Sequence, residues 1–338
     1  MDKKIKAAIL GYGRNGSTMH ADAIEKNSAF DLTAVCDIDE NARNKAHVRF
    51  NCRVYENYRE MIEKEGLDLV VIVTRSSQHC EMTCDCLAAG KNVLVTKPWA
   101  VNSIEAEKMI AAAKDNGKLL LPWLPARWGA DLVRLREIIK SGIIGKVFQV
   151  RRSEFIFAVR HDWQTLKEFG GGYLLNWGSH LIDQPVQLLG EPVKSVYGNM
   201  KQVINPGDVE DIFYAVMKTA DDTIIVSEFN IGLGGLPNWI IQGDRGTILA
   251  RGVDIEIHTA VLPEKTDSSA YGISAKISTE AERISGDRYG DTDFIYAHIA
   301  DAFLGNTQYS VSTDSALNLT RILDAVRKSN DTGHVVYL

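Results

Sequence analysis

The stretch "IKAAILGYGRNGSTMHADAIEKN", residues 5–27, decides the fold. It opens with a short apolar run, passes at once into GYGRNG with the spacing G-x-G-x-x-G, and continues into a helical stretch. The next apolar run, DLTAVCD, ends at Asp37, about 20 residues beyond the glycines. A strand, a glycine-rich turn, a helix, a second strand and an acidic residue in this order predict a βαβ unit that binds a dinucleotide.

Each glycine of the turn has its own physical task. Gly11 permits the tight turn, Gly13 lets the backbone approach a pyrophosphate, and Gly16 lets the helix pack closely on the strand. The N-terminus of the helix offers free N–H groups to phosphates, so we expect Arg14 and Asn15 to contact the cofactor as well. A glycine-rich turn without a ligand is the alternative interpretation.

Asp37 bears on which dinucleotide is bound. Its carboxylate can accept hydrogen bonds from an adenosine ribose, whereas a 2′-phosphate would meet a like charge at a cost of about 3 kcal/mol at roughly 5 Å. Ile38 and Asp39 follow, so no arginine adjoins Asp37. Arg43, one turn into the next helix, could still accommodate NADP. The sequence therefore favours NAD, with NADP less favoured.

Strands and helices continue to alternate as far as residue 122, which is typical of a parallel, doubly wound sheet. We therefore predict a Rossmann NAD-binding domain over residues 1–122. The expected strands after Asp37 are 68–74, 91–98 and 118–122, and the expected helices are 77–90 and 103–117.

The second half, residues 123–338, has consecutive strands with short turns, which predicts an α+β domain with a large, mostly antiparallel open sheet. Residues 262–291 are polar and indicate an irregular surface excursion or lid. Too few helices remain to cover both faces of the sheet, so we expect a homodimer or homotetramer packed through it. The expected strands are 211–219, 223–231, 238–250, 254–260 and 334–338, and the expected helices are 130–142, 293–305 and 314–329.

Composition excludes several classes of partner. The chain has 338 residues, a formal net charge of −6 and no basic run, which argues against nucleic-acid binding. No apolar stretch approaches the roughly 20 residues that a transmembrane helix needs, so we expect no membrane partner. The apolar run near the N-terminus is too short for a signal peptide, and we expect a cytoplasmic protein.

Cysteine usage indicates reduced thiols rather than a metal site. The five cysteines are odd in number, and three of them fall in the stretch CEMTCDC. No second Cys/His cluster completes a zinc site, so we expect no metal. The five are Cys36, Cys52, Cys80, Cys84 and Cys86.

The stretch GGGYLLNWGSHLID, residues 170–183, places an amide, an imidazole and a carboxylate on a helix behind three glycines. Asn176, His180 and Asp183 are spaced by four and three residues, so they are expected along one helical face. A buried face normally avoids such residues, so they either satisfy one another in the core or line a site. The glycines fit a backbone that passes close to a ligand or turns sharply.

Lys97 lies at the carboxyl end of a predicted parallel strand, where open α/β sheets bind their ligands. There it can lie beside the nicotinamide, donate a hydrogen bond to a substrate oxygen and stabilise negative charge on that oxygen. A solvated loop lysine is the alternative. Thr74 and His79 follow the preceding strand and are expected beside the cofactor.

The motifs GYGRNG, TKP and GGGYLLNWGSHLIDQ, with the closing DSALNLTRILDAVRKSNDTG, together resemble the glucose–fructose oxidoreductase/inositol dehydrogenase/rhizopine catabolism (Gfo/Idh/MocA) family. The resemblance spans the whole chain. It implies a nicotinamide-dependent oxidoreductase that acts on sugars, cyclitols or their keto forms, with Lys97 and His180 as catalytic residues.

Two positions depart from the family pattern. Thr96 stands where the family has an acidic residue before Lys-Pro, and Asn176 stands where it has an aspartate four residues before the histidine. An amide cannot shuttle a proton, but Asn176 can still position a hydroxyl at the catalytic centre. His180 is then the main acid–base candidate, with Lys97 as its electrostatic partner.

The stretch RHDWQ, residues 160–164, could also contact a sugar. Trp163 could stack on the apolar face of the ring while Arg160 binds its hydroxyls, although a surface loop with one packed tryptophan is nearly as well supported. Asp183 could bind substrate, orient the imidazole of His180, or make a packing contact only. Arg127 matches a family position near the interdomain cleft and carries little weight.

The leading hypothesis is an NAD-dependent dehydrogenase that transfers hydride between nicotinamide and a secondary hydroxyl or ketone of a sugar or cyclitol. A second hypothesis is a closed redox cycle, in which transient oxidation permits elimination or glycoside cleavage and no net NADH is formed. A third is an NAD-binding sensor without catalysis. The presence of both Lys97 and His180 argues against the third, because a sensor would be free to lose them.

Overall fold

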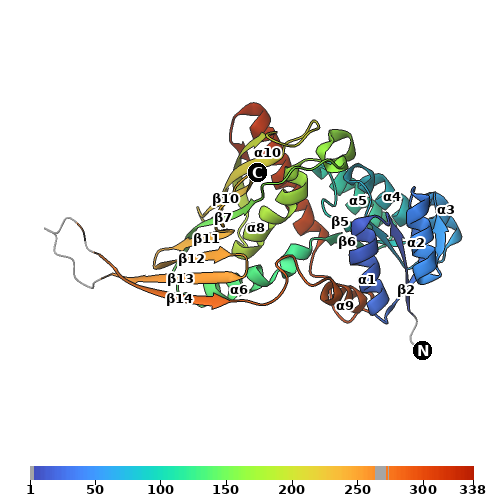
Figure 1. Cartoon of the computed structure of the whole chain (residues 1–338), viewed down its shortest axis with the longest axis horizontal. Coiled ribbons are helices and arrows are strands. Elements are labelled where there is room, and N and C mark those ends of the chain that lie inside the picture. The colour runs from blue at the N-terminus through green and yellow to red at the C-terminus, as the bar shows by residue number, and fades with distance from the viewer. Residues whose placement is uncertain (1–3, 263–271, 273) are drawn as a thin grey trace. The chain divides into compact units, whose positions relative to one another are not determined.

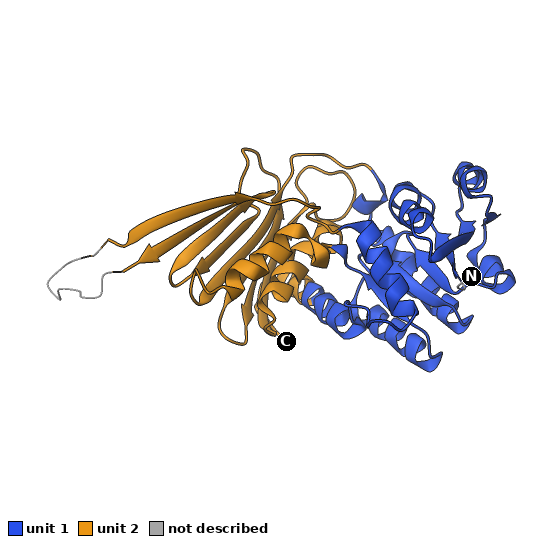
Figure 2. Cartoon of the chain, turned by 90° about the horizontal axis from the view of Figure 1, so that it is seen from below, with its two compact units in different colours: residues 1–125, 162–171, 291–324 blue, residues 126–161, 172–290, 325–338 orange. Residues whose placement is uncertain are grey.

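The computed structural model describes residues 4–262, 272 and 274–338, and the chain divides into two compact units (Figures 1 and 2). Both halves of the sequence contribute to unit 1, and the division of the chain at residue 122 stays a prediction. Unit 1 comprises residues 1–125, 162–171 and 291–324, and unit 2 comprises residues 126–161, 172–290 and 325–338.

Unit 1 holds a six-stranded parallel sheet in the order β3-β2-β1-β4-β5-β6. This is the strand order of dinucleotide-binding folds, in which the direction of winding reverses between β1 and β4 and ligands bind outside the carboxyl ends of the strands. The predicted parallel, doubly wound sheet is therefore confirmed. The strands are β1 (Ile5–Leu10), β2 (Phe30–Cys36), β3 (Arg53–Tyr55), β4 (Leu69–Ile72), β5 (Asn92–Thr96) and β6 (Leu120–Trp123).

Several helices of unit 1 begin at polar side chains that accept hydrogen bonds from the first turn: α2 at Asp39, α3 at Asn57 and α5 at Asn102. Unit 1 also includes α9 and the first part of α10 from the end of the chain. The helices are α1 (Ala21–Lys26), α2 (Glu40–Phe50), α3 (Tyr58–Lys64), α4 (His79–Ala88), α5 (Ser103–Asp115), α9 (Thr292–Phe303) and α10 (Thr313–Thr332).

The buried imidazole of His20, which follows the glycine-rich turn, contacts Tyr296 of α9. His20 Nδ1 lies 2.8 Å from the Tyr296 hydroxyl, and the His20 ring lies 4.9 Å from the Trp123 ring, centroid to centroid. His20 is completely buried, and burial lowers its pKa to about 3. The folded chain therefore holds this imidazole neutral while the unfolded chain protonates it near pH 6.5.

Replacing His20 with glutamine is expected to reduce the loss of unfolding free energy at acid pH. The His20 contribution is fully present above pH 6.5 and is lost as the pH falls from 6.5 towards 3, because only the unfolded state takes up the proton. Between pH 7.5 and 5 the wild type should lose about 2 kcal/mol more unfolding free energy than the variant, as urea denaturation at both pH values would measure. His161→Gln, at an exposed ring, is the control, and equal losses in all three proteins would contradict the prediction.

Unit 2 holds a nine-stranded sheet in the order β14-β13-β12-β11-β7-β10-β9-β8-β15. Neighbouring strands are antiparallel except β7 and β10, which are parallel, so the predicted mostly antiparallel sheet is confirmed. The strands are β7 (Val147–Phe155), β8 (Val193–Lys201), β9 (Ile212–Thr219), β10 (Ile224–Asn230), β11 (Trp239–Gly243), β12 (Gly246–Arg251), β13 (Asp254–Val261), β14 (Lys276–Arg283) and β15 (Val336–Tyr337).

Helices pack on one face of this sheet, as Figure 2 shows for unit 2. They are α6 (Ala130–Lys140), α7 (Ser179–Leu181), α8 (Asp183–Leu189) and the end of α10. The core forms where the apolar side of α6, with Leu132, Leu135 and Ile138, meets Val150 and Ile241 of the sheet. Among the described residues no helix is long and apolar enough to cross a membrane.

The expectation of an irregular excursion over residues 262–291 is wrong for residues 276–283, which form β14 and pair with β13 along its length. Seven of the eight side chains in β14 are exposed, so the strand has no apolar alternation to reveal it. Glu282 alone is half-buried, in an ion pair with Arg134 of α6. Residues 263–271 and 273 of the expected excursion lie outside the described residues.

Candidate functional site

The glycine-rich turn of unit 1 fits a dinucleotide at each of its three glycines. Gly11 has a φ of +90°, and a Cβ atom there would lie 2.7 Å from the Val73 carbonyl oxygen. A Cβ at Gly16 would overlap the carbonyl oxygen of Gly11, whereas one at Gly13 would meet nothing within 4 Å. The turn and the helix contact therefore require glycine, and the open space at Gly13 lets a pyrophosphate approach the backbone.

The helix that follows the turn begins with exposed residues, Arg14 and Asn15. The hydroxyls of Ser17 and Thr18 both donate to the Arg14 carbonyl oxygen, at 3.2 and 2.8 Å. The first N–H groups of a helix have no partner within the helix, so those of this exposed turn can bind an anion. The contacts of Arg14 and Asn15 with the cofactor stay predictions.

The Asp37 carboxylate is fixed at the carboxyl end of β2. It accepts hydrogen bonds from the backbone N–H groups of Tyr12, at 2.6 Å, and Asp39, at 2.9 Å. Arg43 donates to the backbone carbonyl of Asp37 at 2.9 Å and lies 3.6 Å from the Glu56 carboxylate, with its side chain only 16% exposed. Arg43 is therefore committed to protein groups, which favours NAD over NADP at this position.

His79 links the loops that follow β4 and β5. Its Nδ1 lies 2.8 Å from the Pro98 carbonyl oxygen and its Nε2 lies 3.2 Å from that of Thr74. Burial lowers the pKa of His79, and a neutral imidazole donates from only one nitrogen at a time. His79 thus braces Pro98, and with it the half-buried Lys97 at the end of β5. Its contact with the cofactor stays a prediction, as does that of Thr74.

The segment that precedes the three glycines packs on the nucleotide-binding unit. The Phe169 ring lies under the Arg75 guanidinium at 3.9 Å, and a Cβ at Gly170 would lie 2.9 Å from that of Ser76. Both contacts are with residues just after β4, so this segment lies beside the expected cofactor loop. Trp163 is half-buried in the same segment.

Arg160 belongs to unit 2, where its backbone N–H donates to Asn205 Oδ1 at 2.8 Å. Trp163 belongs to unit 1. The two residues are thus held by different units, and their joint contact with one sugar ring stays a prediction.

Close backbone approaches explain the glycines at 171 and 172. A Cβ at Gly171 would overlap the Gln164 carbonyl oxygen, and one at Gly172, whose φ is +106°, would lie 2.5 Å from the Glu210 carboxylate. Glu210 Oε1 accepts a hydrogen bond of 2.9 Å from the Leu174 N–H, and burial raises the Glu210 pKa. Gly171 therefore makes room for a backbone carbonyl, and Gly172 makes room for a carboxylate that caps the helical turn behind it.

The expected single regular helix over this stretch is wrong. The chain forms a π-helical turn, Leu174–Gly178, and then the separate helices α7 and α8. The Ser179 hydroxyl donates to the Leu175 carbonyl oxygen at 2.6 Å, and such wide turns often mark functional positions. Asn176 lies within the π-helical turn and His180 in α7, and both are buried. Their catalytic roles stay predictions.

Asp183 is held by an arginine that the sequence analysis gave little weight. Arg127 Nε and Nη2 donate to the two carboxylate oxygens of Asp183 at 2.9 and 2.8 Å, and Asp183 is 1% exposed. This two-point ion pair supports the interpretation of Asp183 as a packing contact. Its roles in substrate binding and in orienting the imidazole stay predictions.

Aromatic rings surround His180 within unit 2. The Tyr289 ring lies 5.2 Å from the imidazole and the Trp177 ring lies 6.5 Å away, centroid to centroid. Trp177 in turn stacks on Phe229 of β10 at 5.1 Å. The sequence analysis missed Tyr289, which falls in the stretch 262–291 that was expected to be irregular.

No group of three or more His, Cys, Asp or Glu side chains in the described parts of the chain could hold a metal ion. The five cysteines are free thiols. Burial raises the pKa of Cys80 and of Cys86 to about 12, so neither is a ready nucleophile.

The strand order and the glycine-rich turn define a dinucleotide-binding protein. The chain belongs to the Gfo/Idh/MocA family of oxidoreductases. Residues 5–122 match the family's sequence profile described as an oxidoreductase family with an NAD-binding Rossmann fold, and residues 132–249 match its C-terminal domain. The protein is therefore an NAD-binding oxidoreductase.

The chain is similar to two relatives with named activities and to one solved structure. It is 24% identical over 349 residues to scyllo-inositol 2-dehydrogenase (NADP(+)) IolW of Bacillus subtilis, which covers 99% of this chain and 96% of the relative. It is 30% identical over 205 residues to D-glucoside 3-dehydrogenase of Escherichia coli, covering 59% and 58%. The structure of an NAD-binding protein from Listeria innocua superposes with a TM-score of 0.86 at 24% identity, covering 99% and 97%.

Proposed function

We propose that this protein is an NAD-dependent dehydrogenase that interconverts a secondary hydroxyl and a ketone on a sugar or cyclitol. The observation that carries the proposal is His180, an imidazole buried among aromatic rings directly after the π-helical turn that holds Asn176. Two relatives named as a scyllo-inositol 2-dehydrogenase and a D-glucoside 3-dehydrogenase support the substrate class.

Each proposed site residue has a distinct task. Bound NAD supplies the hydride acceptor. The Lys97 ammonium donates a hydrogen bond to the reacting oxygen and stabilises the negative charge that develops there. A His180 ring nitrogen takes the hydroxyl proton and returns it in the reverse direction. The Asn176 amide cannot titrate, so it orients a neighbouring hydroxyl by hydrogen bonding.

A single-turnover experiment tests the proposal. Concentrated protein is mixed with NAD and with sugars and cyclitols one at a time, and the absorbance of reduced nicotinamide is followed. The expected result is a rise with one substrate class. Silence across a broad panel, with NAD binding demonstrated separately, would contradict the dehydrogenase and favour a closed redox cycle or a sensor.

Asp37→Asn is expected to weaken the discrimination between the two dinucleotides. The amide keeps an oxygen for the Tyr12 N–H, loses the acceptor for the Asp39 N–H, and removes the charge that would face a 2′-phosphate. The ratio of the NADP to the NAD dissociation constant should fall about 10²-fold, equivalent to the ~3 kcal/mol of like-charge repulsion. Fluorescence titration measures both constants without a substrate.

Asp39→Asn is the matched control for this experiment. Its side chain caps α2, a task that asparagine performs as well as aspartate. Its dissociation constants should therefore match those of the wild type. An unchanged ratio in Asp37→Asn would remove Asp37 from cofactor selection.

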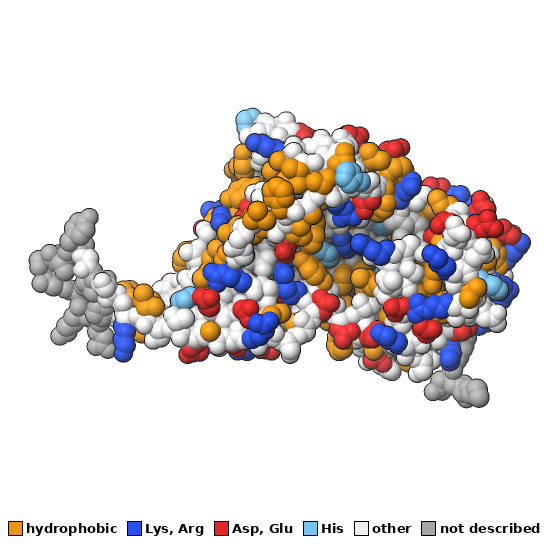
Figure 3. All heavy atoms as spheres, viewed as in Figure 1, with side chains coloured by type: hydrophobic (Ala, Val, Ile, Leu, Met, Phe, Trp, Pro, Cys, Tyr) orange, Lys and Arg blue, Asp and Glu red, His pale blue; other side chains and the backbone are white. Residues whose placement is uncertain are grey.

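We also propose a homodimer or homotetramer that forms through the sheet of unit 2. Helices pack on one face of that sheet, and the pairing of β8 with β9 and β15 places Tyr197, Lys218 and Tyr337 together on the other face. Tyr197 and Tyr337 are 40% and 81% exposed, and Figure 3 shows further hydrophobic side chains on the surface of unit 2. Light scattering should find a dimer or tetramer that Tyr197→Glu weakens, and a monomeric wild type would contradict the proposal.

The five free thiols support a cytoplasmic location.

A further inference from the structure

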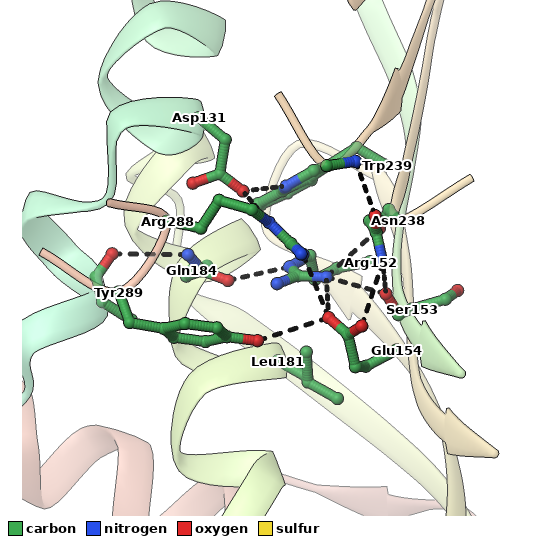
Figure 4. Close-up of polar contacts among 12 residues, drawn as sticks. Asp131, Arg152, Ser153, Glu154, Leu181, Gln184, Asn238, Trp239, Arg288 and Tyr289 are labelled. Carbon is green, nitrogen blue, oxygen red and sulfur yellow. Dashed lines mark hydrogen bonds and ion pairs between the residues drawn. The ribbon is translucent and has the colours of Figure 1, made fainter. Parts of the chain in front are cut away.

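We propose that Tyr289 is a positioning residue that holds the His180 imidazole in one orientation, with its own hydroxyl anchored by a buried cluster of charges. This cluster, named the Glu154 cluster here, consists of Asp131, Arg152, Glu154 and Arg288 (Figure 4). The inference rests on the proposed function in one respect only, the catalytic role of His180.

The rings of Tyr289 and His180 are in contact. Their centroids lie 5.2 Å apart with an interplanar angle of 56°, and the Trp177 ring lies 6.1 Å from that of Tyr289. The imidazole therefore has aromatic neighbours in Tyr289 and Trp177. Where these rings occupy the space that another rotamer of His180 would need, they limit rotation about its χ angles.

The hydroxyl of Tyr289 points into the Glu154 cluster, as Figure 4 shows. It donates to Glu154 Oε2 at 3.3 Å. Arg288 Nη2 donates to the same oxygen at 3.0 Å, and Arg152 Nη1 lies 3.6 Å from it. One carboxylate oxygen thus links the tyrosine to two guanidinium groups.

Further contacts hold the cluster together. Arg152, completely buried in β7, donates to the Gln184 side chain at 2.8 Å, and its guanidinium lies 5.0 Å from the Trp239 ring. Trp239 Nε1 donates to Asp131 at 2.9 Å, and Asp131 lies 3.7 Å from Arg288. The buried charges of Arg152 and Asp131 are thus accompanied by the partly buried Glu154 and Arg288, so two positive and two negative side chains balance, which is the condition for burying such charges.

The backbone on both sides of Tyr289 is also fixed. A Cβ at Gly129 would overlap the Arg288 carbonyl oxygen, so the segment passes directly over the start of α6. The Ala130 N–H donates to the Asp287 carbonyl oxygen at 2.9 Å, and the Tyr289 N–H donates to Asp287 Oδ1 at 2.8 Å. Tyr289 is consequently held by both its main chain and its hydroxyl.

Tyr289 acts through position and not through proton transfer. Burial raises its pKa to about 12, so the phenol stays neutral and keeps donating to Glu154 at working pH. Two substitutions separate the role of the Tyr289 ring from that of its hydroxyl. Tyr289→Phe keeps the ring beside His180 and loses only the hydroxyl, whereas Tyr289→Leu loses the aromatic wall.

Imidazole NMR of the full chain, with labelled histidines and with His180 assigned from a His180→Asn variant, tests the proposal without any substrate. We expect Tyr289→Leu to shift the His180 ring resonances and to change their pH titration, and Tyr289→Phe, which keeps the ring but frees it from Glu154, to cause smaller changes of the same kind. Trp239→Phe, which disturbs the same cluster at Asp131 and leaves both the Tyr289 ring and its hydroxyl bond to Glu154 in place, should preserve the resonances and their titration. Wild-type resonances and titration in Tyr289→Leu, or equal changes in all three variants, would overturn the proposal.

Turnover gives the second readout once a substrate is known. Tyr289→Leu should lower kcat about 10²-fold with an unchanged KM for NAD, because a displacement of about 1 Å at a catalytic group costs that much. Tyr289→Phe should restore most of the rate. If His180 proves dispensable for turnover while the NMR result holds, the proposed function fails and the positioning of His180 by Tyr289 stands.

Discussion

Replacing His180 with glutamine is expected to lower kcat by about 10²–10⁴-fold while NAD still binds with its wild-type dissociation constant. Glutamine fills a similar volume and can hydrogen-bond to a substrate hydroxyl, but it cannot take the proton. Because Asn176 does not titrate either, this chain has no neighbouring carboxylate at the family position to substitute for the imidazole.

The pH–rate profile makes this prediction specific to acid–base catalysis. In the wild type, kcat/KM should fall at low pH as the base becomes protonated, and this acid limb should be missing in His180→Gln. His258→Gln, at the half-exposed imidazole of β13, is the control and should keep both the rate and the limb. A His180→Gln enzyme with wild-type turnover would exclude His180 as the base.

Lys97→Met is expected to lower kcat about 10²–10³-fold, which is the usual effect of removing one donor that stabilises a developing oxyanion. The methionine side chain keeps the length and apolar stem of the lysine and removes only the ammonium. The NAD dissociation constant should change little, because we expect the glycine-rich turn and Asp37 to bind the other end of the dinucleotide.

Lys91→Met is the matched control, at the opposite end of β5. Lys91 precedes β5, whereas Lys97 follows it, and its ammonium donates to the Glu65 carbonyl oxygen at 2.8 Å. The Lys91→Met variant should therefore lose at most some stability and should keep the wild-type kcat. Equal losses of rate in both variants would indicate that Lys97 acts only through the fold.

The sequence predicted unit 1 well because its strands are continuous apolar runs joined by recognisable turns. It placed a helix at Arg43, where the structure has α2, but gave that helix no bounds and assigned no element to β3 and α3. Only Ala46 of α2 is buried, so the helix has almost no apolar stripe from which to infer its bounds. In unit 2 the central strand β7 was missed because it carries Arg152 and Glu154, whose burial depends on partners elsewhere in the chain.

The residues of the candidate site likewise fall into those that the sequence predicted and those that it did not. Local motifs pointed to the glycines, Lys97 and His180, because each follows a strand or a turn with a physical reason for its residue type. Contacts across long sequence separations could not be predicted. The hydroxyl of Tyr289 meets Glu154 across 135 positions, and Arg127 meets Asp183 across 56. Neither pair leaves a spacing or a periodicity in the sequence.

Transfer of deuterium tests the central claim most directly. Sugars or cyclitols with deuterium on the reacting carbon are mixed with NAD and excess protein, and the nicotinamide is examined by mass spectrometry after one turnover. We expect one deuterium in the reduced nicotinamide, with the label lost from the carbon that becomes the ketone. Substrate conversion without labelled, released NADH would contradict the dehydrogenase assignment.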